Sequence, residues 1–399
     1  MRILLMADIH IGSIKDINYF YNTITDIIEK EIIFKKTDIF IILGDYFDKL
    51  FKTNEDFTSL AINIMSYIVR ACSKTKTKIR IIYGTESHEM NQYRLFNYHL
   101  TSNDIDMKIF ETVTEEEIDG TKILYIPEEY IEDKNKHYKK YLYSEKHYDF
   151  IFGHGVIEDG MPAVVSYGAE NKNNKEKQVP RFKSGELSRV SDICVFGHYH
   201  CFTDMHNNVY YLGSLFRDSF GEEIPKGYGI IDSNDNKNSD NKYSFTFIEN
   251  KNAYDYITIE FPQSSSIYSG ENALIKEINK IKNEYIDLFN GNKHGKIRLK
   301  FNTPPDIDPK FKETLKSILF DEKFINTTIK ESSNELISEI EEDIEDEWDF
   351  IIDPSLPIID KIYQFMNKQY DDPMPLDKLN SYLKKSLALI SAKRKDSDI

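Results

Sequence analysis

The first 260 residues of this chain predict an α/β fold. Short apolar runs of strand length alternate there with longer amphipathic stretches, as they do in βαβ units. Five of the apolar runs lead within three residues to Asp, His or Glu. With 399 residues, the chain is long enough for more than one domain and for a sizeable core. We therefore expect an α/β domain that collects polar residues at its strand ends.

The expected elements follow from these patterns in chain order. Five strands that end in polar residues are predicted at Arg2 to Ala7, Asp38 to Leu43, Lys78 to Tyr83, Tyr148 to Phe152 and Ile193 to Phe196. Helices are predicted at Ile17 to Phe34 and Asp56 to Ser73, each after one of these strands. Further β runs, the later ones antiparallel, are predicted at Lys108 to Val113, Lys122 to Pro127, Asn208 to Leu212, Tyr228 to Asp232 and Tyr243 to Ile248.

A domain boundary is predicted near Pro262, where a Ser-rich stretch follows the last of these runs. Residues 1–260 would form the first domain and residues 261–332 a small α+β domain, with helices at 272–284 and 309–319 and strands at 296–301 and 324–330. Residues 333–399 would be an acidic linker and C-terminal helices. The last helix carries an apolar stripe from Leu376 to Ile390, which could pack on the parent domain or bind a partner.

The bulk composition favours a cytoplasmic protein. Three cysteines without metal-type spacing fit a reducing compartment, and no apolar run is long enough to span a membrane. The many Lys, Asn, Ile and Tyr residues are typical of an AT-rich genome, such as that of a phage whose proteins work in the host cytoplasm. The net charge of -16 argues against nucleic acid as a partner, but basic stretches such as Lys134 to Lys146 could still meet phosphate.

Residues at the predicted strand ends suggest one metal site, because ligands bind beyond the carboxyl ends of strands in such sheets. In an extended loop, Asp8 and His10 would point to the same side, and Asp45 after Gly44 could bridge two cations. The later candidates are His154, His198 and His200. Each motif alone is a weak signal, since turns and surface loops often carry Asp and His. Together, Asp and His without Cys suit Mn, Fe or Zn, and two such ions can clamp a phosphoester displacement.

His88 is a candidate of another kind. An imidazole can protonate a leaving oxygen near neutral pH, so we assign His88 the role of general acid. Glu89 could orient that imidazole or could be solvated, and Asp48 is expected to support the site rather than to bind an ion.

The ordered motifs Asp-x-His, Gly-Asp-x-x-Asp, Gly-x-x-x-His-Glu, Gly-His and Gly-His-x-His, over residues 1 to about 215, resemble the calcineurin-like metallophosphoesterase superfamily. The sequence after the last histidine, from Gly213 to Tyr228, is similar to that of the SbcD-type DNA nuclease subunit and its phage recombination counterparts. The resemblance implies a four-layer α/β/β/α sandwich with a small α+β capping domain and C-terminal helices. It further implies two Mn²⁺ ions, with Asp8, His10, Asp45 and His200 on one, Asp45, His154 and His198 on the other, and His88 as the catalytic residue.

The implied activity is exonuclease cleavage of DNA ends and endonuclease cleavage of single-stranded DNA, in repair or recombination. The implied partners are an SbcC-like ABC-type ATPase, bound through the C-terminal helices, and a second copy of the chain.

One departure concerns the usual Gly-Asn-His stretch, whose Asn is a ligand of the second ion in the family. Here the sequence is Gly84-Thr85-Glu86-Ser87-His88-Glu89, so Glu86, Ser87 or water would have to replace the Asn. Two other functions therefore stay open. One is a phosphatase or phosphodiesterase of the same fold, and the other is a weakly active scaffold that bridges DNA and the ATPase.

Overall fold

The computed structural model describes residues 1–51, 56–101, 105–160, 178–222, 224–233, 242–303, 311 and 324–331. These residues divide into two compact units, which are treated separately below. The first unit comprises Met1–Ile257 and Lys282–Lys296, and the second comprises Thr258–Ile281 and the described part of Ile297–Ile399. The predicted helix at 309–319, apart from Phe311, and the predicted segment at 333–399 lie outside the described residues. The predicted division into three domains therefore stays a prediction.

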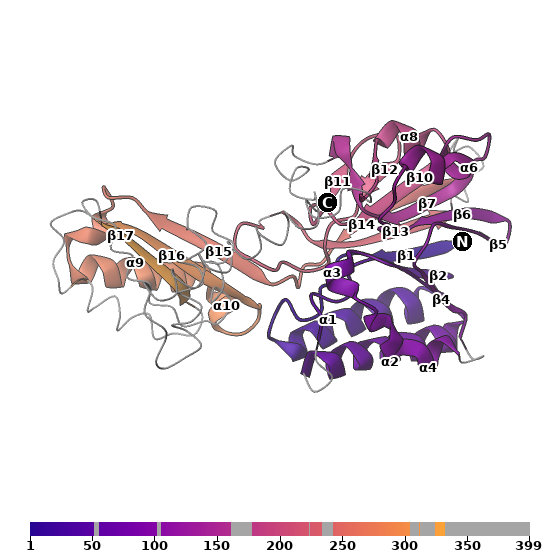
Figure 1. Cartoon of the computed structure of the whole chain (residues 1–399). Helices are drawn as coiled ribbons and strands as arrows, with labels where there is room; N and C mark the ends of the chain where they lie inside the picture. Colours follow the sequence, from indigo (N-terminus) through magenta and orange to yellow (C-terminus); the bar gives the residue numbers. More distant parts are fainter. Residues whose placement is uncertain are drawn as a thin grey trace, which may run out of the picture. The chain divides into compact units, whose positions relative to one another are not determined.

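The first unit contains two mixed sheets of six strands each (Figure 1). The first sheet has the order β14-β13-β1-β2-β3-β4, formed by Tyr243–Glu249, Gly227–Ser233, Arg2–Met6, Ile39–Leu43, Lys78–Ile82 and Met107–Phe110. Strands β1 to β4 are parallel, whereas β13 is antiparallel to both of its neighbours. The carboxyl ends of β1, β2 and β3 therefore meet at one edge.

The second sheet has the order β11-β12-β10-β7-β6-β5, formed by Thr203–Asp204, Val209–Tyr211, Ser191–Gly197, Tyr148–His154, Thr121–Ile126 and Thr114–Ile118. The expectation that the later strands are antiparallel is right for β13 and β14 but wrong for β12, which runs parallel to β10. The reason is the short strand β11, which runs antiparallel to β12 and so reverses the chain between β10 and β12.

Alternating side chains divide the core into layers. In β1, Leu4 and Met6 pack with helices α1 (Ile17–Ile28) and α2 (Asp56–Thr75), whereas Ile3 and Leu5 pack with residues of the second sheet. The far face of the second sheet packs with residues of α6 (Lys139–Leu142) and α8 (Ser184–Ser188). The first unit is thus an α/β fold with two mixed sheets, consistent with a metallophosphoesterase sandwich. The predicted helices are both present, although α1 continues as a π-helical segment over Glu29–Phe34.

One ion pair links the two sheets through their shared core. Arg80 of β3 is 1% exposed, and its Nε lies 2.7 Å from Glu116 Oε2 of β5. Its Nη1 also lies 2.9 Å from Asp106 Oδ1. Because the guanidinium has almost no access to water, its charge depends on these two carboxylates.

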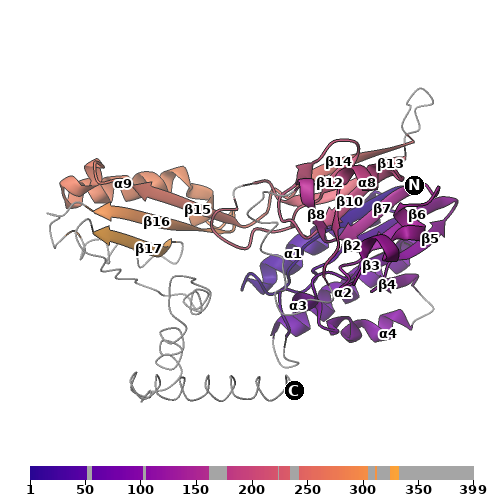
Figure 2. The same cartoon turned by 45° about the horizontal axis from the view of Figure 1, so that its top comes forward.

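Most of a three-stranded sheet belongs to the second unit; its order is β15-β16-β17, formed by Asp255–Phe261, Gly295–Thr303 and Phe324–Glu331 (Figure 2). The predicted strands at 296–301 and 324–330 are confirmed as β16 and β17, and the predicted helix at 272–284 is α9 (Glu271–Glu284). Strand β16 buries every second residue, as expected for a sheet with one covered face. Across both units, none of the helices among the described residues is long and apolar enough to cross a membrane.

Candidate metal centre

Six loops that follow parallel strands bring polar side chains together. Three loops follow β1, β2 and β3 of the first sheet, and three follow β6, β7 and β10 of the second. The sequence analysis expected the carboxyl ends of strands to supply the site. Three strands of each sheet lead to residues of the cluster, so the cluster lies where the two sheets meet.

Asp8, His10 and His200 form the first group of ligand atoms. One atom from each lies within 4.8 Å of the others. His10 Nε2 lies 3.0 Å from His200 Nε2, so two imidazoles present the same nitrogen to one point. Asp8 is fixed by the backbone N–H of His198, which donates to its two carboxylate oxygens at 2.9 and 3.1 Å.

Glu128, His154 and His198 form the second group, again with ligand atoms within 4.8 Å of one another. Glu128 Oε2 lies 3.4 Å from His198 Nδ1 and 3.9 Å from His154 Nε2. His154 Nδ1 donates to the backbone carbonyl of Leu43 at 2.8 Å, which leaves Nε2 to face the cluster. A backbone acceptor for the second ring nitrogen is the usual support of a metal-binding histidine.

Asp45 lies between the two groups. Its Oδ2 is 3.9 Å from His10 Nε2 of the first group and 3.4 Å from His154 Nε2 of the second. The backbone N–H of Thr85 donates to Asp45 Oδ1 at 2.6 Å and holds the carboxylate in this position. The Asp45 carboxylate therefore lies within 4 Å of a histidine from each group, and its role as a bridge between two ions stays a prediction.

The loops reach this arrangement through left-handed backbone conformations rather than through the extended loops that we expected. The φ angles are 46° at Asp8, 47° at His10, 47° at Asp45 and 93° at His198. Residues other than glycine rarely adopt positive φ, and such strain is concentrated at functional sites. The expectation that Asp8 and His10 meet by strand-like alternation is thus wrong, because both residues turn through the left-handed region.

Two glycines allow the loops to come this close. A Cβ atom on Gly44 would lie 2.2 Å from His154 Nδ1, and one on Gly84 would lie 2.2 Å from Asp45 Oδ1. Any side chain at either position would occupy space that a cluster residue needs.

The electrostatics of the cluster favour bound positive charge. Burial lowers the pKa of His10 and of His198 to about 3, which leaves both imidazoles neutral with a free lone pair. Burial also lowers the pKa of His154, but the carboxylates of Asp45, Asp8 and Glu128 outweigh burial and raise it to about 10. A proton on His154 therefore occupies the position that a cation would take, and binding a metal ion would release it.

The donor set fits a pair of divalent ions. Asp8, Asp45 and His154 are each at most 3% exposed, and His10 is 3% exposed. Buried carboxylates and imidazoles without thiolates suit Mn, Fe or Zn. These buried His and Asp clusters are consistent with a dinuclear metal site.

His88 lies beside the first group, on the short helix α3 (Glu86–Glu89). Its ring centroid is 4.9 Å from that of His10, and its Nδ1 contacts the backbone carbonyl of Asp48. Nδ1 donates to that carbonyl, so Nε2 is the ring nitrogen left to face a substrate and would carry the second proton of the imidazolium form. Glu89 neither orients His88 nor is solvated, as we had considered. It is fully buried, and its Oε1 accepts the backbone N–H of Tyr46 at 3.0 Å.

Glu86 and Ser87 lie on the first turn of α3, and both are exposed. Glu86 belongs to none of the groups of clustered His, Cys, Asp and Glu atoms among the described residues. The structure thus does not bring the two candidates for the missing Asn to the cluster.

Sequence reasoning missed Glu128, although a signal for it exists. Glu128 directly follows the apolar run Lys122 to Pro127, just as the other candidates follow their strands. The residues that position His200 were also not predicted from the sequence. Lys226 Nζ donates to the His200 carbonyl at 2.9 Å, and Glu222 Oε1 lies 3.6 Å from His200 Nδ1.

Comparison with known proteins identifies the family. The model of the family described as calcineurin-like phosphoesterase matches residues 1–202. The chain belongs to the calcineurin-like phosphoesterase family. This phosphoesterase is a metal-dependent enzyme that hydrolyses phosphoester bonds, and its Asp and His clusters supply the donors for that chemistry.

Among solved structures, the phosphoesterase is similar to Yfce, a phosphoesterase from E. coli, at 12% identity and a TM-score of 0.28, over 58% of this chain and 88% of that chain. It is also similar to a protein of unknown function from Aquifex aeolicus, at 12% identity and a TM-score of 0.23, over 48% of this chain and 93% of that chain. No curated protein matches the sequence significantly.

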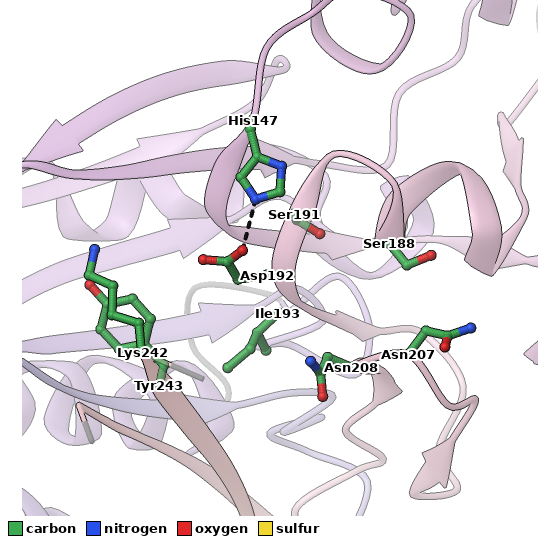
Figure 3. Close-up of a pocket in the computed structure, with 9 residues that line it drawn as sticks. All are labelled: His147, Ser188, Ser191, Asp192, Ile193, Asn207, Asn208, Lys242 and Tyr243. Atoms are coloured by element: carbon green, nitrogen blue, oxygen red, sulfur yellow. Dashed lines mark hydrogen bonds and ion pairs between the residues drawn. The ribbon is translucent and has the colours of Figure 1, made fainter. Parts of the chain in front are cut away.

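A separate pocket of about 550 Å³ lies at the other end of the second sheet of the phosphoesterase (Figure 3). It is lined by residues at the amino ends of β7 and β10, among them His147 and Asp192, which are joined at 2.8 Å. Because the cluster lies beyond the carboxyl ends of the same strands, this pocket is not part of the metal centre.

Proposed function

We propose that this phosphoesterase is the metal-dependent DNA nuclease subunit of an SbcC–SbcD-type repair or recombination complex. The observation that carries the proposal is the cluster itself. Two groups of buried donors share Asp45, and His88 stands beside them in the place of a general acid. A diester of DNA needs both features, because its leaving 3' oxygen must be protonated while charge builds up on the phosphoryl oxygens.

The residues would divide the work as follows. Asp8, His10, Asp45 and His200 would hold one ion, and Asp45, His154 and His198 the other. The two ions, which we propose to be Mn²⁺, would polarise the phosphate and supply the nucleophile at neutral pH. His88 would donate its proton to the leaving oxygen, with the Asp48 carbonyl fixing the ring.

Basic residues in the second unit support nucleic acid as the substrate. Arg298 and Lys300 are separated by one residue on β16, so both lie on the half-exposed face opposite Ile297, Leu299 and Phe301. Arg298 Nη2 donates to Thr258 Oγ1 at 3.1 Å, which orders the guanidinium. Two cations on one sheet face suit contacts to a phosphate backbone, in spite of the acidic chain as a whole.

We further propose that the chain acts as a homodimer and binds an SbcC-like ATPase through its C-terminal helices. Exposed apolar side chains in the segment after His88 support a dimer surface there. Tyr98 is 82% exposed and Met90 is 46% exposed. The C-terminal helices lie outside the described residues, so the ATPase contact rests on the sequence resemblance alone.

A substrate panel with Mn²⁺ tests the proposal. We expect cleavage of linear double-stranded DNA from its ends and cleavage of circular single-stranded DNA, each stimulated by a co-expressed SbcC-like ATPase. We expect much slower turnover of p-nitrophenyl phosphate and cyclic nucleotides. Efficient monoester or cyclic nucleotide hydrolysis without DNA cleavage would instead identify a phosphatase or phosphodiesterase of the same family.

A further inference from the structure

We infer that Glu128 supplies the ligand of the second ion that replaces the family's Asn, so that this ion has a carboxylate where an amide is usual. The inference concerns the same dinuclear centre and rests on the proposed function only in so far as that function requires two ions. Glu128 lies outside the sequence motifs that resemble the family.

The position of the Glu128 carboxylate carries the inference. Its Oε2 lies within 4 Å of both histidines of the second group, 3.4 Å from His198 Nδ1 and 3.9 Å from His154 Nε2. Thr85 Oγ1 lies 3.4 Å from the same oxygen and 3.4 Å from His154 Nε2. Glu128 Oε2 therefore lies close to His154 Nε2, His198 Nδ1 and Thr85 Oγ1.

The fold fixes Glu128 there through two connections. Ile126 of β6 pairs with Gly153 of β7, so Glu128 emerges from the sheet beside His154. The backbone N–H of Glu128 donates to the Tyr83 carbonyl at 3.1 Å, which ties the loop after β6 to the end of β3. The side chain is 7% exposed, so the carboxylate is held among the cluster residues rather than in water.

In the family, the Asn ligand lies in the loop after β3. In this chain the same loop instead hydrogen-bonds to Asp45 and leads into α3. Thr85 uses its backbone N–H to hold Asp45, and helix α3 begins at the next residue. Glu86 and Ser87 are consequently on the exposed side of α3. We therefore infer that Glu128, which follows a strand of the second sheet, takes the ligand position that the Asn after β3 has in the family.

This exchange changes the charge of the centre. With Glu128, three carboxylates face two divalent cations, whereas an amide would leave two carboxylates, Asp8 and Asp45. An additional anionic oxygen ligand strengthens binding of hard cations such as Mn²⁺ and Mg²⁺. We expect the second site of this chain to hold Mn²⁺ tightly and to accept Mg²⁺.

Metal binding, measured without any substrate, tests the inference. The full chain is stripped with chelator, and Mn²⁺ is titrated with calorimetry and followed by electron paramagnetic resonance, which distinguishes a coupled pair from a single ion. We expect two ions in the wild type. We expect Glu128→Gln, which keeps the shape and removes the charge, to bind the second ion at least about 10- to 100-fold more weakly and to lose the coupled signal.

Glu86→Gln is the matched control, and Glu128→Asp is the conservative variant. The control should bind two ions as the wild type does, and the conservative variant should recover part of the affinity. Thermal melting of the metal-free variants checks that all of them fold. If Glu128→Gln binds two coupled ions with wild-type affinity, or if Glu86→Gln loses the second ion, the inference is wrong. If the wild type binds two ions and depends on Glu128 but cleaves no DNA, the proposed function fails while the ligand assignment stands.

Discussion

Replacing Gly84 by alanine is expected to damage the centre through a single methyl group. Gly84 lies in the loop after β3, against Asp45. A Cβ atom there would lie 2.2 Å from Asp45 Oδ1 and 2.4 Å from the Asp45 backbone nitrogen. The methyl group would therefore clash with both the carboxylate and the backbone nitrogen of Asp45.

The size of the effect follows from these contacts. Ordinary contact of a Cβ atom begins at 3.4 Å, so the gap to the 2.2 Å found for Oδ1 is 1.2 Å. Rotation of the Asp45 side chain cannot remove the clash, because the backbone nitrogen is also too close. A shift of about 1 Å at a reacting centre can cost on the order of 100-fold in rate. We expect a loss of this order in kcat/KM for Gly84→Ala, together with weaker binding of Mn²⁺.

The assay is Mn²⁺-dependent hydrolysis of bis(p-nitrophenyl) phosphate, a simple phosphodiester. Gly185→Ala in α8 is the matched control, because a Cβ atom there meets none of the described atoms within 4 Å. Thermal melting of both variants separates loss of fold from loss of geometry. A folded Gly84→Ala protein with the kcat/KM of the control would refute the argument that Gly84 sets the position of Asp45.

Three further predictions follow from the described contacts. His88→Asn should still bind two Mn²⁺ ions by calorimetry but lose about 100- to 10,000-fold in kcat, whereas a wild-type rate would exclude the acid role. Arg80→Ala removes a buried guanidinium together with its contacts to Glu116 and Asp106, and should lower the free energy of unfolding by about 1.5–3 kcal/mol in urea, whereas unchanged stability would contradict this expectation. Burial alone would raise the pKa of Glu116, but the hydrogen bonds and charges of Arg80 and Lys108 outweigh burial and hold that pKa below its ordinary value. The stabilisation by Glu116 is therefore present above the ordinary pKa of a glutamate and is lost as pH falls through the lower folded pKa, so the stability gap between wild type and Glu116→Gln should shrink in acid.

Most strands of the two large sheets could be predicted from the sequence, because buried strands are apolar along most of their length. Strands β1, β2, β7 and β10 are almost continuous apolar runs, as expected for strands covered on both faces. Strand β5 was missed because its sequence, Thr114 to Ile118, contains three consecutive glutamates. One of them, Glu116, is drawn inward by Arg80, a tertiary contact that no local pattern reveals.

The candidate site was predictable in part for a similar reason. The end of an apolar run marks the end of a strand, and that rule found Asp8, Asp45 and His154. The rule could not predict the left-handed backbone at Asp8 and Asp45, where the two loops, distant in sequence, are joined by the hydrogen bond from the Asp8 N–H to the Gly44 carbonyl. It also could not rank Glu128 above Glu86, because the order of strands in the second sheet decides which carboxylate reaches the cluster.

The same tertiary contacts imply that the fold, rather than the metal, positions the donors. Asp8 accepts the His198 backbone N–H and Asp45 accepts the Thr85 backbone N–H, so hydrogen bonds within the protein orient both carboxylates. The cost is strain at the left-handed residues, on the order of 1–3 kcal/mol each, and mutual repulsion of buried charges. Bound ions would offset the repulsion. Chelation should therefore lower the melting temperature, and Mn²⁺ at about 100 times its Kd should restore about 2.7 kcal/mol. If the fold sets the geometry, Mn²⁺ should rebind without a slow refolding phase, whereas a centre built by the metal would show one.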